Sequence, residues 1–170
     1  MNIRRAWTTV PVALLLAACG PSDASEAPAG EARPTPVASA RTDAPLPAIV
    51  VYKTASCGCC NGWVEHLRAA GFEVDARDVT DLMSIKRDAG VPVDMSSCHT
   101  ALVDGYVVEG HVPADVVMRL LDERPEVAGI AAPGMPVGSP GMEGPGARPY
   151  SVQSVDRQGG REVFAEVDPR

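Results

Sequence analysis

The sequence lacks the features that mark several large protein classes. No run of Lys or Arg follows Arg5, and the 170-residue chain carries a net charge of −7 with a pI near 4.9. It therefore has no basic footprint for nucleic acids, and we do not expect DNA or RNA as partners. Apolar residues are only 45% and charged residues 22% of the chain, which is typical of soluble globular proteins rather than of disordered or multi-span membrane proteins.

The N-terminal segment has the pattern of an export signal. Arg4 and Arg5 precede an uncharged stretch over 6–22, which is shorter than the roughly 20 apolar residues that a membrane-spanning helix needs. It ends in Leu16-Ala17-Ala18-Cys19, which resembles the bacterial lipobox. We therefore expect a signal peptide over 1–18, lipid modification of Cys19 and a membrane-anchored protein that faces the periplasm. An ordinary signal peptide with an incidental Cys is the alternative.

A linker is expected over 20–47, where the chain is rich in Ala, Pro, Ser and Thr without apolar periodicity. The first 47 residues hold four basic and four acidic residues, so the whole net charge of −7 belongs to the remainder. We expect residues 48–168 to form one acidic folded domain.

The first half of this domain predicts a βαβα pattern. The apolar, β-branched run over 49–52 suits a buried strand. Trp63, Val64, Leu67 and Ala70 then recur at helical spacing before Gly71. Residues 72–79 alternate like a second strand, which makes a βαβ unit with parallel strands. A second helix is expected from Thr80 or Asp81 to Gly90.

The second half predicts two hairpins, a third helix and a long loop. Asp104-Gly105 favours a type I′ turn between strands over 100–103 and 106–109. Pro113 opens a helix with an apolar stripe. Residues 129–149 hold six Gly, five Pro and two Met, and we expect an ordered loop or lid there, without a central strand. A terminal hairpin over 150–167 follows.

The most informative residues are four cysteines. Cys57, Cys59 and Cys60 lie at the junction of the first strand and helix, and Cys98 precedes the third strand. A Cys at a helix N-terminus is favoured as the thiolate, which is both a nucleophile and a metal ligand. In a thiol–disulfide oxidoreductase Cys57 would attack and Cys60 would resolve. Cys59 would then compete as a disulfide partner for either neighbour, whereas a metal site can use all three thiols as ligands. The motif therefore favours metal binding.

The element order, with Cys57 and Cys60 spaced as Cys-x-x-Cys, resembles the thioredoxin fold over about 48–125: a mixed α/β sheet flanked by helices. Four motifs are together similar to CopG-type copper proteins, the small periplasmic family encoded with copper-resistance systems, over about 48–145. They are Cys57-Gly58-Cys59-Cys60, Ser97-Cys98-His99-Thr100, Glu109-Gly110-His111-Val112-Pro113 and the segment from Pro133 to Glu143.

This resemblance implies a thioredoxin-like domain that holds copper through cysteines, in a thiolate-bridged cluster. It also implies that the third strand runs antiparallel to the first, so that Cys98 faces the loop of Cys57, Cys59 and Cys60. The segment Ser97-Cys98-His99 stands where thioredoxins have a cis-Pro, which argues against ordinary thioredoxin-type substrate binding.

Four thiolates suit Cu(I), and they also suit tetrahedral zinc. Adjacent Cys59 and Cys60 favour bridging of several metal ions, and Met135 and Met142 add soft sulfur, so we expect copper, as Cu(I) in a multinuclear site, in preference to zinc. His99 and His111 are further candidate ligands. A strand turns successive side chains to opposite faces, so Cys98 and His99 reach one metal only where the strand is irregular.

The sequence thus predicts a copper-binding protein of the cell envelope that acts in copper tolerance by sequestration or by a change in the oxidation state of copper. Its partners would be copper ions, the membrane through its lipid, and other envelope copper-handling proteins. A thiol–disulfide oxidoreductase that uses Cys57 and Cys60, a zinc module and a copper chaperone are the alternatives, and the sequence does not establish enzymatic turnover.

Overall fold

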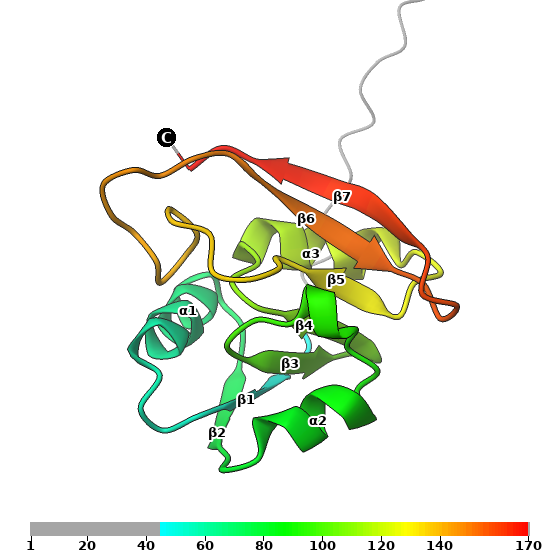
Figure 1. The fold of residues 1–170 in the computed structure, drawn as a ribbon, viewed down its shortest axis with the longest axis horizontal. Coiled ribbons are helices and arrows are strands. Elements are labelled where there is room, and N and C mark those ends of the chain that lie inside the picture. The colour runs from blue at the N-terminus through cyan, green and yellow to red at the C-terminus, as the bar shows by residue number, and fades with distance from the viewer. Residues whose placement is uncertain (1–44, 170) are drawn as a thin grey trace, which may run out of the picture. The chain divides into compact units, whose positions relative to one another are not determined.

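The fold is known from a computed structural model that describes residues 45–169; the expected signal peptide, Cys19 and most of the expected linker lie outside these residues. In the described part, seven strands form one mixed sheet in the order β2-β1-β3-β4-β5-β6-β7 (Figure 1). The predicted thioredoxin-like α/β sheet flanked by helices is confirmed.

The predicted βαβα half is present. Its elements are β1 (Ile49–Lys53), α1 (Gly58–Ala69), β2 (Val74–Asp78) and α2 (Leu82–Asp88). Strands β1 and β2 pair in parallel, as the crossover through α1 requires. Asp81 is the residue that caps α2: its carboxylate accepts a hydrogen bond from the Ser84 backbone N–H at 3.0 Å. A short 3-10 turn, η1 (Val93–Met95), then leads toward Cys98.

The central hairpin also forms as predicted. Strands β3 (Thr100–Val103) and β4 (Tyr106–Glu109) are antiparallel, and Asp104 and Gly105 both have positive φ, at 46° and 83°. These angles are those of the expected type I′ turn. Strand β3 also runs antiparallel to β1, as the family resemblance implied. Helix α3 (Ala114–Glu123) follows.

The expectation that 129–149 holds no central strand is wrong at its first residues. Gly129–Ala131 form β5, which pairs in parallel with β4 and antiparallel with β6. A side chain on Gly129 would collide with the Val107 carbonyl, so glycine here permits close approach of two strands rather than breaking one. Through β5, the predicted terminal hairpin of β6 (Tyr150–Val155) and β7 (Arg161–Val167) joins the sheet.

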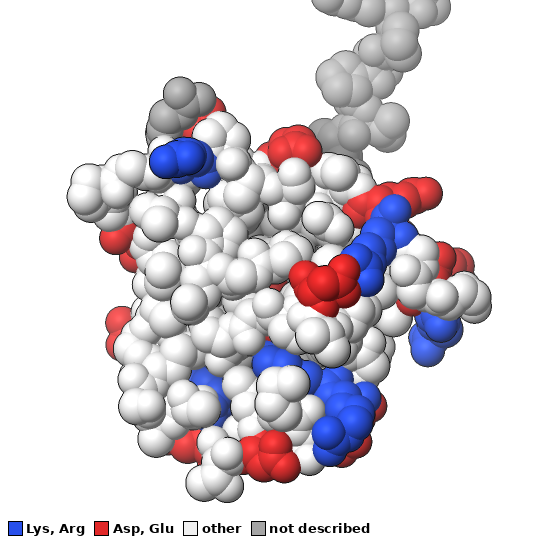
Figure 2. Space-filling model, in the orientation of Figure 1, with Lys and Arg blue, Asp and Glu red and all other residues white. Residues whose placement is uncertain are grey.

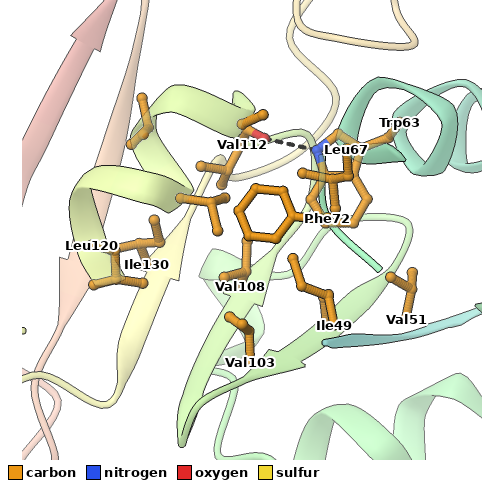
Figure 3. Close-up of a cluster of buried hydrophobic side chains, with 14 of the residues drawn as sticks. Ile49, Val51, Trp63, Leu67, Phe72, Val103, Val108, Val112, Leu120 and Ile130 are labelled. Carbon is orange, nitrogen blue, oxygen red and sulfur yellow. Dashed lines mark hydrogen bonds between the residues drawn. The ribbon is translucent and has the colours of Figure 1, made fainter. Parts of the chain in front are cut away.

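The main core lies between the sheet and helices α1 and α3. Ile49, Val51 and Val108 point from the sheet toward Leu67 of α1 and Leu120 of α3 (Figure 3). Trp63 is fully buried at one side of this cluster, where its indole N–H donates to the Val112 carbonyl at 2.7 Å (Figure 3). This bond ties the first turns of α1 to the segment that follows β4.

The other sheet face is partly covered by α2, whose Lys86 reaches Thr100 and Glu109. On the face drawn in Figure 2, acidic and basic side chains are interspersed, and much of the surface is uncharged. Among residues 45–169 no helix has both the length and the apolar character to cross a bilayer.

Candidate metal site

Three of the four cysteines lie at the start of α1. Strand β1 ends at Lys53, and a turn closed by a hydrogen bond from the Cys57 N–H to the Thr54 carbonyl at 3.1 Å leads into the helix. Cys57 is the N-cap residue, and its side chain makes no capping hydrogen bond. Cys59 and Cys60 belong to the first turn. The three sulfurs therefore lie at the positive end of the helix dipole, which favours thiolates.

The fourth cysteine is brought to the first three by the sheet register. Thr100 pairs with Tyr52, so the residues just before β3 lie beside the residues just after β1. The Cys60 sulfur lies 3.7 Å from the Cys98 carbonyl oxygen, and the four Sγ atoms all lie within 4.8 Å of one another. The structure thus brings together the four cysteines that the sequence analysis selected.

The four sulfurs are not in one redox state. Cys57 and Cys60 are joined by a disulfide, whereas Cys59 and Cys98 are free. The Sγ of Cys59 lies 3.6 Å from that of Cys57. A metal could use all four sulfurs only after the disulfide is reduced, because ligation requires deprotonated thiols.

Both candidate histidines lie against Cys98. Its sulfur is 2.9 Å from Nε2 of His111 and 3.4 Å from Nδ1 of His99, and these three residues form a second group with ligand atoms within 4.8 Å. Strand β3 begins only at Thr100, so Cys98 and His99 precede the regular strand. The local irregularity that the sequence analysis required for His99 is therefore present.

The protonation of His111 follows from its second hydrogen bond. Its Nδ1 lies 2.7 Å from the Pro140 carbonyl oxygen, which can only accept, so Nδ1 carries the proton and Nε2 turns a lone pair toward Cys98. A backbone carbonyl that fixes the tautomer in this way is the usual outer partner of a metal-ligating histidine. Sequence reasoning missed the Pro140 carbonyl, because a backbone acceptor leaves no signal in residue type.

His99 is buried in an aromatic setting. Its ring centroid lies 4.3 Å from that of Trp63 and 4.9 Å from that of His111. It has no exposed surface, and within the described residues its Nε2 has no hydrogen-bond partner. A buried, unpaired ring nitrogen is costly, and a bound ion is one way to satisfy it.

Burial sets the charge states of these groups. It lowers the pKa of His99 to about 3, with further lowering from the charges of His111 and Lys86, and it also lowers the pKa of His111. Both imidazoles are therefore neutral near pH 7, as metal ligation requires. Burial, followed by the neighbouring Cys59, raises the pKa of the Cys98 thiol to about 11. In the metal-free protein Cys98 is thus a thiol that must lose its proton to bind a metal.

The long loop after β5 contacts the site through Pro140 and Gly141, which lie between the two candidate methionines. A Cβ built on Gly141 would lie 2.5 Å from the Cys59 carbonyl oxygen and 2.7 Å from the Trp63 nitrogen. The loop is thus packed against the first turns of α1. Met135 is 55% exposed, and Met142 is half-buried.

A buried ion pair beside the site was not foreseen. Lys86 and Glu109 are 3% and 1% exposed, and the Lys86 ammonium lies 2.5 Å from the Glu109 carboxylate. Lysine on a helix and glutamate at a strand end are both usually solvated, so neither residue type suggests this pair.

Comparisons with known proteins agree with this geometry. A family model described as a protein of unknown function, DUF411, matches residues 95–142. No curated protein matches the chain. A solved structure titled "Copper resistance protein copG- Form 2" is 47% identical, with a TM-score of 0.69, and the match covers 73% of this chain and 99% of that one. For the structure titled "Form 1" the values are 46% identity, a TM-score of 0.68, and coverage of 72% and 98%. The chain therefore belongs to the CopG family of copper resistance proteins.

Proposed function

We propose that this protein binds Cu(I) in the cell envelope and thereby contributes to copper tolerance. The observation that carries the proposal is the convergence of four cysteine sulfurs within 4.8 Å of one another. Cys57, Cys59, Cys60 and Cys98 would be the ligands. The titles of the two similar structures, both copper resistance proteins, support copper as the metal.

The donor set fits copper on chemical grounds. Thiolates are soft ligands that select Cu(I), although they also accept zinc. Cys59 and Cys60 are adjacent in one helical turn, an arrangement better suited to bridging several ions than to enclosing one. His111, with its Nε2 lone pair already directed at Cys98, and His99, whose Nδ1 lies 3.4 Å from the Cys98 sulfur, are the nearest additional donors. Zinc remains the less favoured metal.

The Cys57–Cys60 disulfide supports a link between binding and redox state. Formation of this disulfide from two thiols releases two electrons and two protons, enough to reduce two Cu(II) ions to Cu(I). With the disulfide closed, Cys59, Cys98 and the imidazoles remain as donors. With it open, all four thiols are available. The protein would therefore hold copper differently in its two redox states.

The Pro140–Gly141 contact supports a role for the loop over 132–149 as a cover of the site. In this role Met135 and Met142 would offer thioether sulfur to departing copper ions. An N-terminal lipid on Cys19 would hold the domain at the membrane through the linker, facing the periplasm, where copper ions and other envelope copper-handling proteins are its partners.

The direct test is metal analysis of protein purified anaerobically from cells grown with and without added copper. We expect several copper ions per chain with copper and little zinc in either preparation. Zinc at one ion per chain, independent of copper, would favour a zinc module.

A thiol–disulfide oxidoreductase is the second candidate, and the Cys57–Cys60 disulfide is the observation that favours it. Such an enzyme reduces the disulfides of insulin in the presence of a small dithiol, whereas a copper-binding protein does not. Absence of copper together with insulin reduction that is lost in Cys57→Ser would replace the copper proposal with this one.

A further inference from the structure

We infer that Glu109, held by Lys86, is a positioning residue for Cys98 and His99. The inference rests on the proposed function, because it concerns the segment that would supply the copper ligand Cys98. Neither residue touches the four sulfurs, so its effect on copper would act through the backbone.

The Glu109 carboxylate binds the residues on both sides of Cys98-His99, the ligand segment. Oε1 of Glu109 accepts a hydrogen bond from the Ser97 backbone N–H at 2.6 Å, and Oε2 accepts one from the Thr100 hydroxyl at 2.8 Å. Ser97 and Thr100 are the residues immediately before and after Cys98-His99. The two ligand candidates therefore lie on a short segment whose two ends are fixed to the same side chain.

Lys86 of α2 also binds this carboxylate. Its ammonium donates to Oε1 of Glu109 at 2.5 Å and to the Thr100 hydroxyl oxygen at 3.0 Å. The network thus joins three elements: α2, the start of β3 and the end of β4. The lysine gives Oε1 a second partner and also binds the Thr100 hydroxyl oxygen, so the carboxylate is held in one orientation.

The network also reaches the second ligand segment. Glu109 is the last residue of β4, and His111 follows it by two residues. The Gly110 N–H donates to the His99 carbonyl at 3.2 Å, so the two segments are joined directly as well. The backbone that carries Cys98 and the backbone that carries His111 are therefore both connected to Glu109, while the Pro140 carbonyl orients the His111 ring.

Stability alone gives little reason to bury this pair. Desolvation of two charges commonly costs as much as their attraction returns, and apolar replacements of similar size are often neutral or stabilising. A specific orientation of the Ser97 N–H is something that apolar side chains could not provide. A positioning role can therefore be distinguished from a structural one by comparing apolar replacements with a replacement that keeps an acceptor for the Ser97 N–H.

The test compares two double variants with wild type. Lys86→Met/Glu109→Met removes every hydrogen bond that the two side chains make in this network but keeps side chains of similar size. We expect it to fold, with some loss of stability from the unpaired Ser97 N–H and Thr100 hydroxyl, to bind Cu(I) about 10- to 100-fold more weakly, the range for loss of an outer-shell partner, and to show faster alkylation of Cys98 in the reduced, metal-free protein. Lys86→Met/Glu109→Gln keeps an acceptor for the Ser97 N–H, and it should restore most of both properties.

Cu(I) affinity is measured by competition with a chromophoric chelator, and alkylation by mass spectrometry of the Cys98 peptide after pulses of iodoacetamide. Lys53→Met is the control, because Lys53 is the other buried lysine but is paired with the exposed Asp78 instead of the ligand segment. It should leave both readouts unchanged.

Wild-type affinity and wild-type Cys98 alkylation in the Met/Met variant would overturn the inference. If that variant does not fold, Thr100→Val, which removes one partner of the carboxylate, takes its place. Wild-type Cu(I) affinity and wild-type Cys98 alkylation in Thr100→Val would then overturn the inference. Failure of the proposed function is a different result, since wild type itself would then bind no copper, while the alkylation readout would still test the positioning role.

Discussion

Gly141 is the point at which the long loop meets helix α1, and replacing it by Ala tests whether that contact holds the loop in place. Its φ is +81°, a conformation that costs a non-glycine residue about 1 to 2 kcal/mol. The new Cβ would also lie 2.5 Å from the Cys59 carbonyl oxygen and 2.7 Å from the Trp63 nitrogen, both closer than real Cβ contacts. Overpacking of this kind typically costs about 1 to 3 kcal/mol. We therefore expect Gly141→Ala to lower the free energy of unfolding by about 2 to 5 kcal/mol.

Two other glycines of the same loop are matched controls. Gly146 has a φ of +88° but open space around its Cβ position, so Gly146→Ala carries the conformational cost without the collision. Gly144 has neither a positive φ nor a neighbour within 4 Å, so Gly144→Ala should change stability by less than about 0.5 kcal/mol. Urea unfolding followed by far-UV circular dichroism gives all three values.

The same series links the loop to the site. If the loop covers the copper site, Gly141→Ala should also speed the loss of Cu(I) to a chelator, and Gly146→Ala should not. Equal destabilisation by Gly141→Ala and Gly146→Ala, within about 0.5 kcal/mol, would show that the loop does not pack on α1 as described and would refute the reasoning.

Three further predictions concern the loop, the anchor and pH. Replacing Met135 and Met142 together by Leu keeps volume but removes thioether ligands, so Cu(I) should transfer faster to a chelator at unchanged stability; an unchanged rate removes both residues from the site. Cys19→Ala should release soluble protein that still binds copper, which cell fractionation and metal analysis would show; loss of copper along with the anchor would contradict this. The folded pKa of His99, about 3, lies below its ordinary value of 6.5, so the unfolded state binds more protons than the folded state between these two pH values. The stability of the metal-free protein therefore decreases as the pH is lowered. The fall from pH 7 to pH 5 should be about 2 kcal/mol larger in wild type than in His99→Phe, as measured by urea unfolding at both pH values; equal falls would contradict it.

Much of the fold could be predicted because the local signals agree with one another. Apolar runs, glycine stops and the Asp104-Gly105 turn each indicated an element that is present. Strand β5 could not be predicted because three residues are too few to show alternation, and Gly129 is a strand breaker by composition alone. Its place in the sheet depends on close approach to Val107, which is a tertiary property.

The candidate site likewise has parts that could be predicted from the sequence and parts that could not. Cys57, Cys59 and Cys60 are neighbours in sequence, so their meeting needed only the helix start. Cys98 needed the antiparallel pairing of β3 with β1, which the family resemblance supplied. The orientation of His111 depends on the Pro140 carbonyl, 29 residues away, and no pattern of residue types encodes that contact.

The central claim is that four cysteines form one copper site, and the most direct test is copper stoichiometry in the four single Cys→Ser variants. Trp63, whose ring lies 4.3 Å from that of His99, gives a second readout, because copper bound nearby should quench its emission. Ser56→Ala, at an exposed position beside the cluster, is the control and should behave as wild type. We expect each of Cys57→Ser, Cys59→Ser, Cys60→Ser and Cys98→Ser to bind markedly less copper and to show less quenching. Full stoichiometry and full quenching in Cys59→Ser and Cys98→Ser, with loss only in Cys57→Ser and Cys60→Ser, would contradict the four-cysteine site and leave a two-cysteine site in its place.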